Sequence, residues 1–366
     1  MIFAAPPPPL PLALVAPAER EVSFGRVAGR LPRDRWVVTV RAGDRIIGVR
    51  KVVGGSFDFR VSLPRKESTL RVTASAAHGR RLVARVEHVV GLPRSAAPGA
   101  VVAGRDERLQ RSVSTLLRGF PGTGAAFVED LATGRGAAWN ARARFPAAST
   151  LKVAIAVEAL RAHGGKPEPG SYLDSLLRRM LIDSDNGAAN QVEALFGGGR
   201  RVDEMLQGIG LGDTWMGGGY LRGTPAVIPI PLRVDSQPSF GCCKYTTAFD
   251  LARLLIDVHL AAGGRGPLIS RYGRQFTPSD ARYLLYVLAH VPDRGKLGRF
   301  LAGGPYALLH KAGWTSSVRH DAGLVYWPGG VFVAVVMTWG SGAGASSDVL
   351  AGRVARVTLS RLRRLG

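Results

Sequence analysis

The chain has 366 residues, of which 46% are hydrophobic, and a formal net charge of +22 at pH 7. The apolar content excludes a largely disordered chain, and the length suggests two domains of about 100 to 200 residues each. The positive charge would suit nucleic acid, an anionic membrane surface or an anionic cell-wall polymer. However, only seven of the 49 basic residues are lysines, the arginines are scattered and no nucleic-acid-binding motif occurs. We therefore expect no nucleic-acid partner.

The N-terminal stretch 1–18 is apolar and ends in the small residues APA, as at the cleavage site of an export signal. It lacks a basic beginning and is interrupted by prolines, so we interpret it as the remnant of an export signal. No apolar run of 18 residues occurs elsewhere, and no membrane span is predicted. The only cysteines, Cys242 and Cys243, are adjacent and provide no disulfide framework.

Residues 19–92 show the period-two pattern of β-strands, in runs such as RWVVTV (35–40), FDFRVSL (57–63) and RLVARVEHVV (81–90). Turn residues separate these runs at the spacing typical of a small sandwich. We predict an immunoglobulin-like β-sandwich that serves as an accessory module, because it carries no cluster of catalytic residue types. The segment 93–106, rich in Pro, Gly and Ala, is predicted to be a linker.

Residues 107–366 show a different pattern, with strands at both ends and helices between them. A helix is predicted near 105–118, followed by a hairpin and then by several helices from Ser149 to about residue 262. The strands YALLHKAG, VRHDAGLVYW and GVFVAVVMTWG precede a final basic helix. This order predicts an α+β domain with one antiparallel sheet built from both ends and a helical cluster beside it.

Ser149 stands at the start of the apolar run STLKVAIAVEAL, and Lys152 follows three residues later. Residues three apart share a face of a helix, so the ammonium of Lys152 should come within reach of the Ser149 hydroxyl. Taken alone, S-x-x-K would equally fit a helix cap followed by a lysine that extends to the surface.

Two further motifs follow Ser149 in the sequence. S-D-N occupies 184–186 at the junction of two predicted helices, and K-A-G occupies 311–313 on a predicted strand. In this order, S-x-x-K, S-D-N and K-T-G form the signature of class A β-lactamases and penicillin-binding proteins. Each motif alone is a common coincidence, but the three together favour a catalytic interpretation.

Over residues 105–366 the chain resembles the class A β-lactamase-like and penicillin-binding-protein-like serine hydrolases. The resemblance extends to FPAAST, LLRRMLIDSDNGAANQV, YTTAFDLARLL and HKAGW followed by HDAGLVY. It implies a β-lactamase/transpeptidase-like fold and an acyl-enzyme mechanism without a cofactor. His310 and His320 flank the third motif without the spacing of metal ligands, so we expect no metal site.

The resemblance assigns Ser149 as the nucleophile, Lys152 as its activating base and Ser184 as a proton shuttle. A lysine can act as a base only when burial and neighbouring positive charge lower its pKa, and the apolar helix and Lys311 could supply both. The resemblance also places the oxyanion hole at the backbone N–H groups of Ser149 and Trp314. The substrate-binding residues that it implies are Asn186, Lys311, Gly313, Trp314, Thr315 and Arg319.

The third motif departs from the family pattern. Ala312 stands where the family usually has a hydroxyl that binds the substrate carboxylate. Thr315, Ser316 or Arg319 would have to compensate. Arg319 occupies the next strand, where its neighbour His320 competes for the same role if the register shifts by one residue.

A second departure concerns deacylation. Class A enzymes use a glutamate to activate the hydrolytic water, in the loop before the helix that here begins in YTTAFDLARLL. This chain has no glutamate after Glu204. Between Tyr220 and Tyr245 the only carboxylate is Asp235, which is the candidate deacylation base. Asp235 would also fit an ordinary loop aspartate without a catalytic role, and this is the interpretation that we favour.

These features predict a secreted or cell-wall-associated serine hydrolase that β-lactams or acyl-D-Ala-type amides acylate at Ser149, with slow deacylation. One alternative is a peptidoglycan D-Ala-D-Ala carboxypeptidase or transpeptidase acting on a stem peptide. Another is a non-catalytic cell-wall-binding protein whose basic surface holds an anionic polymer. The intact set of motif residues argues against the non-catalytic alternative, and the missing glutamate argues against efficient β-lactam hydrolysis.

Overall fold

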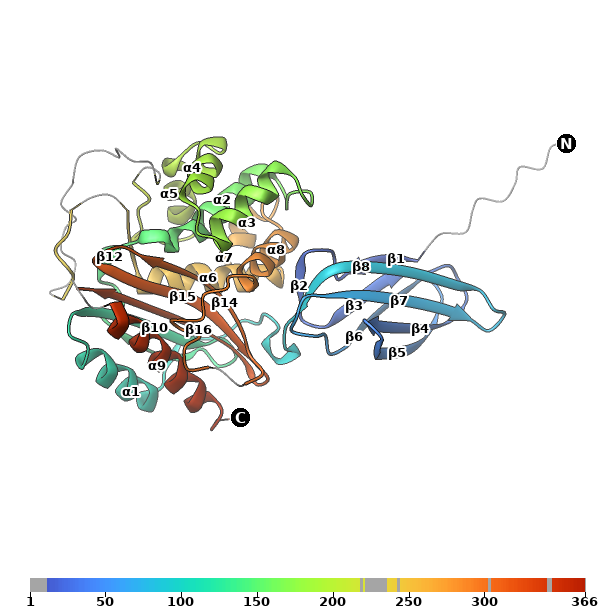
Figure 1. The fold of residues 1–366 in the computed structure, drawn as a ribbon. Helices are drawn as coiled ribbons and strands as arrows, with labels where there is room; N and C mark the ends of the chain where they lie inside the picture. Colours follow the sequence, from blue (N-terminus) through green and yellow to red (C-terminus); the bar gives the residue numbers. More distant parts are fainter. Residues whose placement is uncertain are drawn as a thin grey trace. The chain divides into compact units, whose positions relative to one another are not determined.

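The computed structural model describes residues 12–217, 220, 236–241, 244–301, 304–340 and 344–365 (Figure 1). The chain divides into two compact units, Met1–Arg94 and Ser95–Gly366. Each unit has a hydrophobic core of its own. No helix in the described part of the chain is long and apolar enough to cross a membrane.

The first unit is all-β. One sheet has the order β1-β3-β6 and the other the order β2-β8-β7-β4-β5. Along β4 the residues Trp36, Val38 and Val40 are buried while their neighbours are more exposed, as the alternating sequence predicted. These residues share one core with Val27 and Phe57 of the other sheet. The strands are β1 (Ala13–Ala16), β2 (Glu21–Ser23), β3 (Arg26–Arg30), β4 (Arg35–Ala42), β5 (Arg45–Val53), β6 (Ser56–Arg60), β7 (Ser68–Ala76) and β8 (Arg81–Gly91).

The two sheets thus pack as a sandwich, while the immunoglobulin-like assignment remains a prediction. The strand β1 lies within the stretch 1–18 that the sequence assigned to an export-signal remnant. Leu12 is buried in the core of this unit and Leu14 packs against it. Ala13, Leu14 and Ala16 pair with β3, so this segment of the chain belongs to the folded unit.

The second unit contains a six-stranded sheet built from both ends of the unit, in agreement with the predicted α+β class. Its order is β14 (Ala307–Trp314), β15 (Val318–Trp327), β16 (Gly330–Trp339), β10 (Thr123–Asp130), β11 (Arg135–Trp139) and β9 (Gly104–Arg105). All neighbours are antiparallel except β9 and β11. The short β9 falls within the segment 93–106 that the sequence assigned to a linker.

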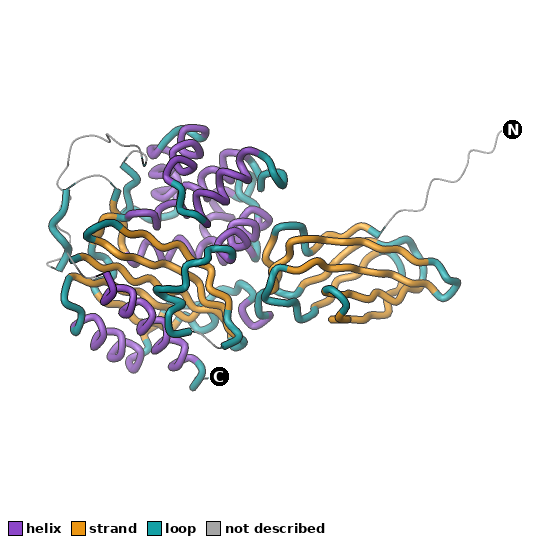
Figure 2. Tube along the Cα trace, viewed as in Figure 1, coloured by secondary structure: helices purple, strands orange, loops and turns teal. Residues whose placement is uncertain are grey.

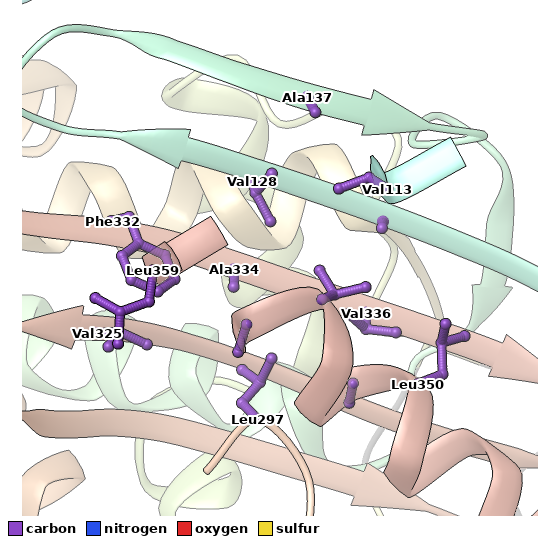
Figure 3. Packing of buried hydrophobic residues seen from close by; sticks show 14 of the residues in the cluster. Val113, Val128, Ala137, Leu297, Val325, Phe332, Ala334, Val336, Leu350 and Leu359 are labelled. Carbon is purple, nitrogen blue, oxygen red and sulfur yellow. The ribbon is translucent and has the colours of Figure 1, made fainter. Parts of the chain in front are cut away.

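Helices cover both faces of this sheet. The helices α1 (Glu107–Arg118) and α9 (Gly344–Leu362) pack on one face, with Val128, Phe332, Val336 and Leu350 in the shared core (Figure 3). The helix α6 (Ala248–Ala262) contacts the opposite face through β10, β15 and β16. Because side chains alternate along a strand, the residues of β10 next to Val128 face α6.

The remaining helices form a cluster beside the sheet (Figure 2). At its centre α2 (Lys152–His163) has buried residues on all sides, as the apolar sequence predicted, and it contacts α3, α4, α5 and α8. A small two-stranded sheet, β12 (Arg144–Pro146) with β13 (Tyr245–Thr247), leads into this region. The other helices are α3 (Tyr172–Ile182), α4 (Asn186–Leu195), α5 (Gly199–Gly208), α7 (Gly266–Tyr272) and α8 (Pro278–Ala289).

Candidate active site

Ser149 lies in a 3₁₀ turn, Ala148–Leu151, that joins β12 to α2. The preceding residue, Ala148, has a φ of 47°, which is unusual for a residue with a side chain. The turn is held by Thr150, whose hydroxyl donates a hydrogen bond to the Ala147 carbonyl at 2.6 Å. Such backbone strain persists only where the surrounding structure fixes it. The half-buried Ser149 is therefore presented by a rigid turn.

Lys152 is the first residue of α2 and is fully buried. Its Nζ donates hydrogen bonds to Asn186 Oδ1 and to the Ser184 carbonyl, both at 2.6 Å. Its pKa is lowered to about 7, first by burial and then by the positive charges of Lys311 and Lys244. The electrostatic conditions that a lysine base requires are thus present.

The helix spacing predicted that Lys152 would reach the Ser149 hydroxyl. Among the described residues no hydrogen bond joins these two side chains, because the ammonium is directed to the oxygen atoms of the S-D-N loop. Such catalytic hydrogen bonds are often long in a structure without substrate.

Ser184 lies between α3 and α4, with a φ of 59°. The next residue, Asp185, caps α4 by accepting a hydrogen bond from the Ala188 N–H at 3.0 Å. The Ser184 hydroxyl accepts a hydrogen bond from Lys311 Nζ at 2.9 Å and lies 3.4 Å from Lys152 Nζ. It therefore bridges the two lysines, which lie far apart in the sequence.

Lys311 and Gly313 lie on the strand β14 at the edge of the sheet. Lys311 is only 3% exposed, and burial lowers its pKa to about 8. A Cβ atom at Gly313 would lie 2.7 Å from the backbone nitrogen of Ser149, so only glycine allows the strand to approach the turn this closely. The third motif thus packs directly against the first.

Trp314 follows on the same strand. The Thr315 N–H donates to the Val318 carbonyl at 3.0 Å, toward β15. Because N–H groups of successive residues point to opposite sides of a strand, the Trp314 N–H points to the outer edge of β14, away from β15. The same edge packs against the turn that holds Ser149. Trp314 itself is 66% exposed.

A cavity of about 500 Å³ lies beyond Gly313, and Trp314, Thr315, Ser316 and Arg319 are among its lining residues. Arg319 Nη1 donates to Asp348 Oδ2 at 3.3 Å. This geometry brings the predicted hydroxyls and the guanidinium together at one end of β14.

His320 is not part of this cavity. It is buried, its Nε2 donates to the Pro146 carbonyl at 2.8 Å, and its Nδ1 accepts from the Thr338 N–H at 3.2 Å. Burial lowers its pKa to about 4, so the imidazole is neutral. His320 ties β12 to the sheet, and between the two candidates the structure places Arg319 in the cavity.

Two residues near Ser149, Tyr220 and Lys244, were not identified as site residues from the sequence. The Tyr220 hydroxyl donates to the Ala148 carbonyl at 2.6 Å, and its ring centroid lies 4.8 Å from Lys152 Nζ and 4.5 Å from Lys244 Nζ. The scarcity of lysine in the sequence could have pointed to Lys244. Four of the seven lysines in this arginine-rich chain lie in or beside this network, namely Lys152, Lys244, Lys296 and Lys311.

The structure does not test every residue that the sequence analysis singled out. Asp235, the candidate deacylation base, lies outside the described residues, as do Cys242 and Cys243. His310 is buried against Asp321, with Nδ1 and Oδ1 2.8 Å apart. Within the described ranges no group of three His, Cys, Asp or Glu side chains could hold a metal ion.

Solved structures with this fold are numerous. The structure of PBP-A covers 75% of this chain and 99% of its own, with 22% identity and a TM-score of 0.56. A β-lactamase from Sphaerobacter thermophilus covers 69% of this chain and 96% of its own, with 20% identity and a TM-score of 0.52. An ancestral class A β-lactamase covers 69% of this chain and 99% of its own, with 20% identity and a TM-score of 0.53. These similarities establish a shared fold.

A search of curated proteins finds no significant match. The model of the β-lactamase enzyme family, by contrast, matches residues 108–166 and 163–362. The match includes all three motifs and nearly the whole second unit. The chain therefore belongs to the β-lactamase enzyme family.

Proposed function

We propose that this protein is a serine acyl-transfer enzyme in which β-lactams, or acyl-D-Ala-type amides, acylate Ser149. The observation that carries the proposal is the hydrogen-bonded set Lys152, Ser184 and Lys311 beside the Ser149 turn. Burial and neighbouring charge bring the pKa of Lys152 to about 7. A lysine with that pKa is partly neutral at physiological pH and can take a proton from a hydroxyl.

In this proposal neutral Lys152 accepts the proton of Ser149 as Ser149 Oγ attacks the substrate carbonyl carbon. When the tetrahedral intermediate collapses, the C–N bond breaks and the nitrogen needs a proton. Ser184 Oγ supplies that proton and regains one from Lys152, which it approaches to 3.4 Å. Lys152 and Ser184 thereby return to their starting protonation states, and the proton lost by Ser149 is balanced by the one that the leaving nitrogen gains.

The negative charge on the substrate oxygen would be stabilised by the backbone N–H groups of Ser149 and Trp314. One such donor contributes about 3 kcal/mol or more to transition-state stabilisation. A substrate carboxylate would bind at the cavity beyond Gly313, where Thr315 supplies a hydroxyl and Arg319 a positive charge. These groups take the place of the hydroxyl that Ala312 lacks.

Deacylation is expected to be slow. The sequence has no glutamate after Glu204, and Asp235 is the only carboxylate of the loop from Tyr220 to Tyr245. Without a base beside the hydrolytic water the barrier rises, and each ~1.4 kcal/mol slows the step tenfold. We expect a burst of about one equivalent of product with a chromogenic cephalosporin. Asp235→Asn should change the later slow phase little, and a collapse of fast turnover in this variant would identify Asp235 as a hydrolytic base.

The test of acylation is intact mass spectrometry after incubation with penicillin. The wild-type protein should gain the mass of one penicillin molecule, and Ser149→Ala should gain none. Ser112→Ala is a suitable control because its hydroxyl donates to the Arg108 carbonyl of its own helix, α1, and Ser112 does not line the cavity beside Trp314. An adduct that persists in Ser149→Ala would refute the assignment of the nucleophile.

A second candidate is a peptidoglycan D-Ala-D-Ala carboxypeptidase or transpeptidase outside the cytoplasm. The missing loop glutamate favours it, because a peptidase of this kind is inhibited by β-lactams through slow deacylation. The similarity in fold to PBP-A is consistent with this candidate. Release of D-alanine from a stem pentapeptide by wild-type protein, but not by Ser149→Ala, would distinguish it from a β-lactam hydrolase.

A further inference from the structure

A second cavity, of about 420 Å³, lies in the same unit on the face of the sheet that packs against α6. It is bounded by β10 and β11, by the short strand β9 and by the beginning of α6. None of its lining residues belongs to the catalytic network described above. They include Arg105, Gln110, Phe127, Glu129, Phe249 and Arg253.

Glu129 is the first unusual feature of this cavity. It lies on β10 beside Val128, on the face that packs against α6, and it is only 5% exposed. Its carboxylate makes no hydrogen bond or ion pair within the described ranges of the chain. A buried carboxylate without a partner is costly, and burial raises the pKa of Glu129 accordingly.

Arg253 is the second unusual feature. It lies on α6 one turn before the buried Asp257, and the closest approach is 3.9 Å between Arg253 Nη2 and Asp257 Oδ1. Within the described part of the chain its guanidinium makes no hydrogen bond. Its charge lowers the pKa of Glu129, but the two groups do not come within ion-pair distance. One cavity thus presents a carboxylate without a partner and a guanidinium that makes no hydrogen bond and only a long ion pair with Asp257.

The wall of the cavity includes an aromatic pair. Phe127 and Phe249 meet edge to face, with their ring centroids 5.6 Å apart and an interplanar angle of 87°. Ala137 and Ala138 of β11 add small apolar groups. An apolar wall with a few convergent polar groups is typical of a small-molecule site, and the volume is within the usual range of about 300 to 1,000 Å³.

We propose that this cavity binds a small zwitterion with an apolar side group, a molecule of the amino-acid class. Its ammonium pairs with Glu129, its carboxylate pairs with Arg253 and its side group packs against Phe127 and Phe249. A simple cation would face the guanidinium of Arg253, and a simple anion would face the carboxylate of Glu129. A ligand with both charges satisfies both groups at once.

Calorimetric titration of the full chain with phenylalanine, in both enantiomers, tests the proposal. N-acetylphenylalanine lacks the ammonium and phenylalaninamide lacks the carboxylate. Each should bind at least about tenfold more weakly than phenylalanine, because each loses one charge-assisted hydrogen-bonded pair. Equal binding of all three compounds, or no binding of phenylalanine up to its solubility limit, would overturn the proposal.

Two variants assign the charges within the site. Glu129→Gln should weaken phenylalanine binding about tenfold or more and remove the preference over N-acetylphenylalanine. Arg253→Met should remove the preference over phenylalaninamide, and Ser149→Ala should leave binding unchanged. Circular dichroism checks that each variant folds. If one variant does not fold, the other variant and the two phenylalanine derivatives still test the proposal. Binding that neither variant weakens would place phenylalanine elsewhere and refute this site.

Discussion

At the scale of single residues, the pKa of Lys152 should determine the pH dependence of acylation. Only the neutral amine can accept a proton, and its pKa is about 7. The rate should therefore rise about tenfold per pH unit below pH 7 and level off above it. Stopped-flow measurement with a fluorescent penicillin between pH 5 and pH 9 provides the profile. A flat profile would show that Lys152 is not the base.

The two lysines of the motifs should respond differently to replacement by arginine. Lys152→Arg should abolish acylation, because a guanidinium remains protonated near neutral pH and cannot act as a base. Lys311→Arg keeps a positive charge beside Ser184 and should retain part of the activity. The second-order rate of acylation measures both. Equal activity of the two variants would mean that Lys152 is only structural.

Lys244 should influence the base without contacting the nucleophile. Its Nζ shares the Tyr220 ring with Lys152, and its charge helps to lower the pKa of Lys152. Lys244→Gln should therefore move the inflection of the pH–rate profile to higher pH. Lys66→Gln, in the other unit, removes the same charge from the chain and should not move it. An unchanged inflection in Lys244→Gln would limit Lys244 to a packing role.

At the scale of elements, the approach of β14 to the Ser149 turn depends on one glycine. A Cβ atom at Gly313 would meet the Ser149 nitrogen at 2.7 Å, so the strand or the turn must shift. Gly313→Ala should reduce the acylation rate by about 100-fold, since misplacement of about 1 Å has an effect of this size. Gly212→Ala, where the added atom meets nothing within 4 Å, is the control. Near wild-type rates in Gly313→Ala would show that this contact does not position the nucleophile.

At the scale of the whole molecule, the two units have separate cores and should unfold separately. Penicillin bound to Ser149 is a ligand of the folded second unit only. Acylation should therefore raise the midpoint temperature of the second unit's transition and leave that of the first unit unchanged. Differential scanning calorimetry with and without penicillin measures this, with Ser149→Ala as the control. A single transition, or an equal shift of both, would show that the units unfold as one.

Much of the architecture follows from local pattern. The period-two runs predicted the all-β first unit, and the order of strands and helices predicted the α+β second unit with a sheet from both ends. The apolar run around Lys152 predicted a helix buried on every side. Such features depend on which side chains of a segment are buried, and the spacing of apolar residues along the sequence indicates this directly.

The sequence by itself determined the family, through three motifs in order, and with it the prediction that Ser149, Lys152 and Lys311 form the active site. Only the tertiary structure decided that Ser184 bridges two lysines, that Tyr220 and Lys244 lie beside the Ser149 turn, and that Arg319 rather than His320 lines the cavity. The reason is physical. The pairing register of a strand decides which face each side chain occupies, and contacts between distant segments leave no periodic signal in the chain.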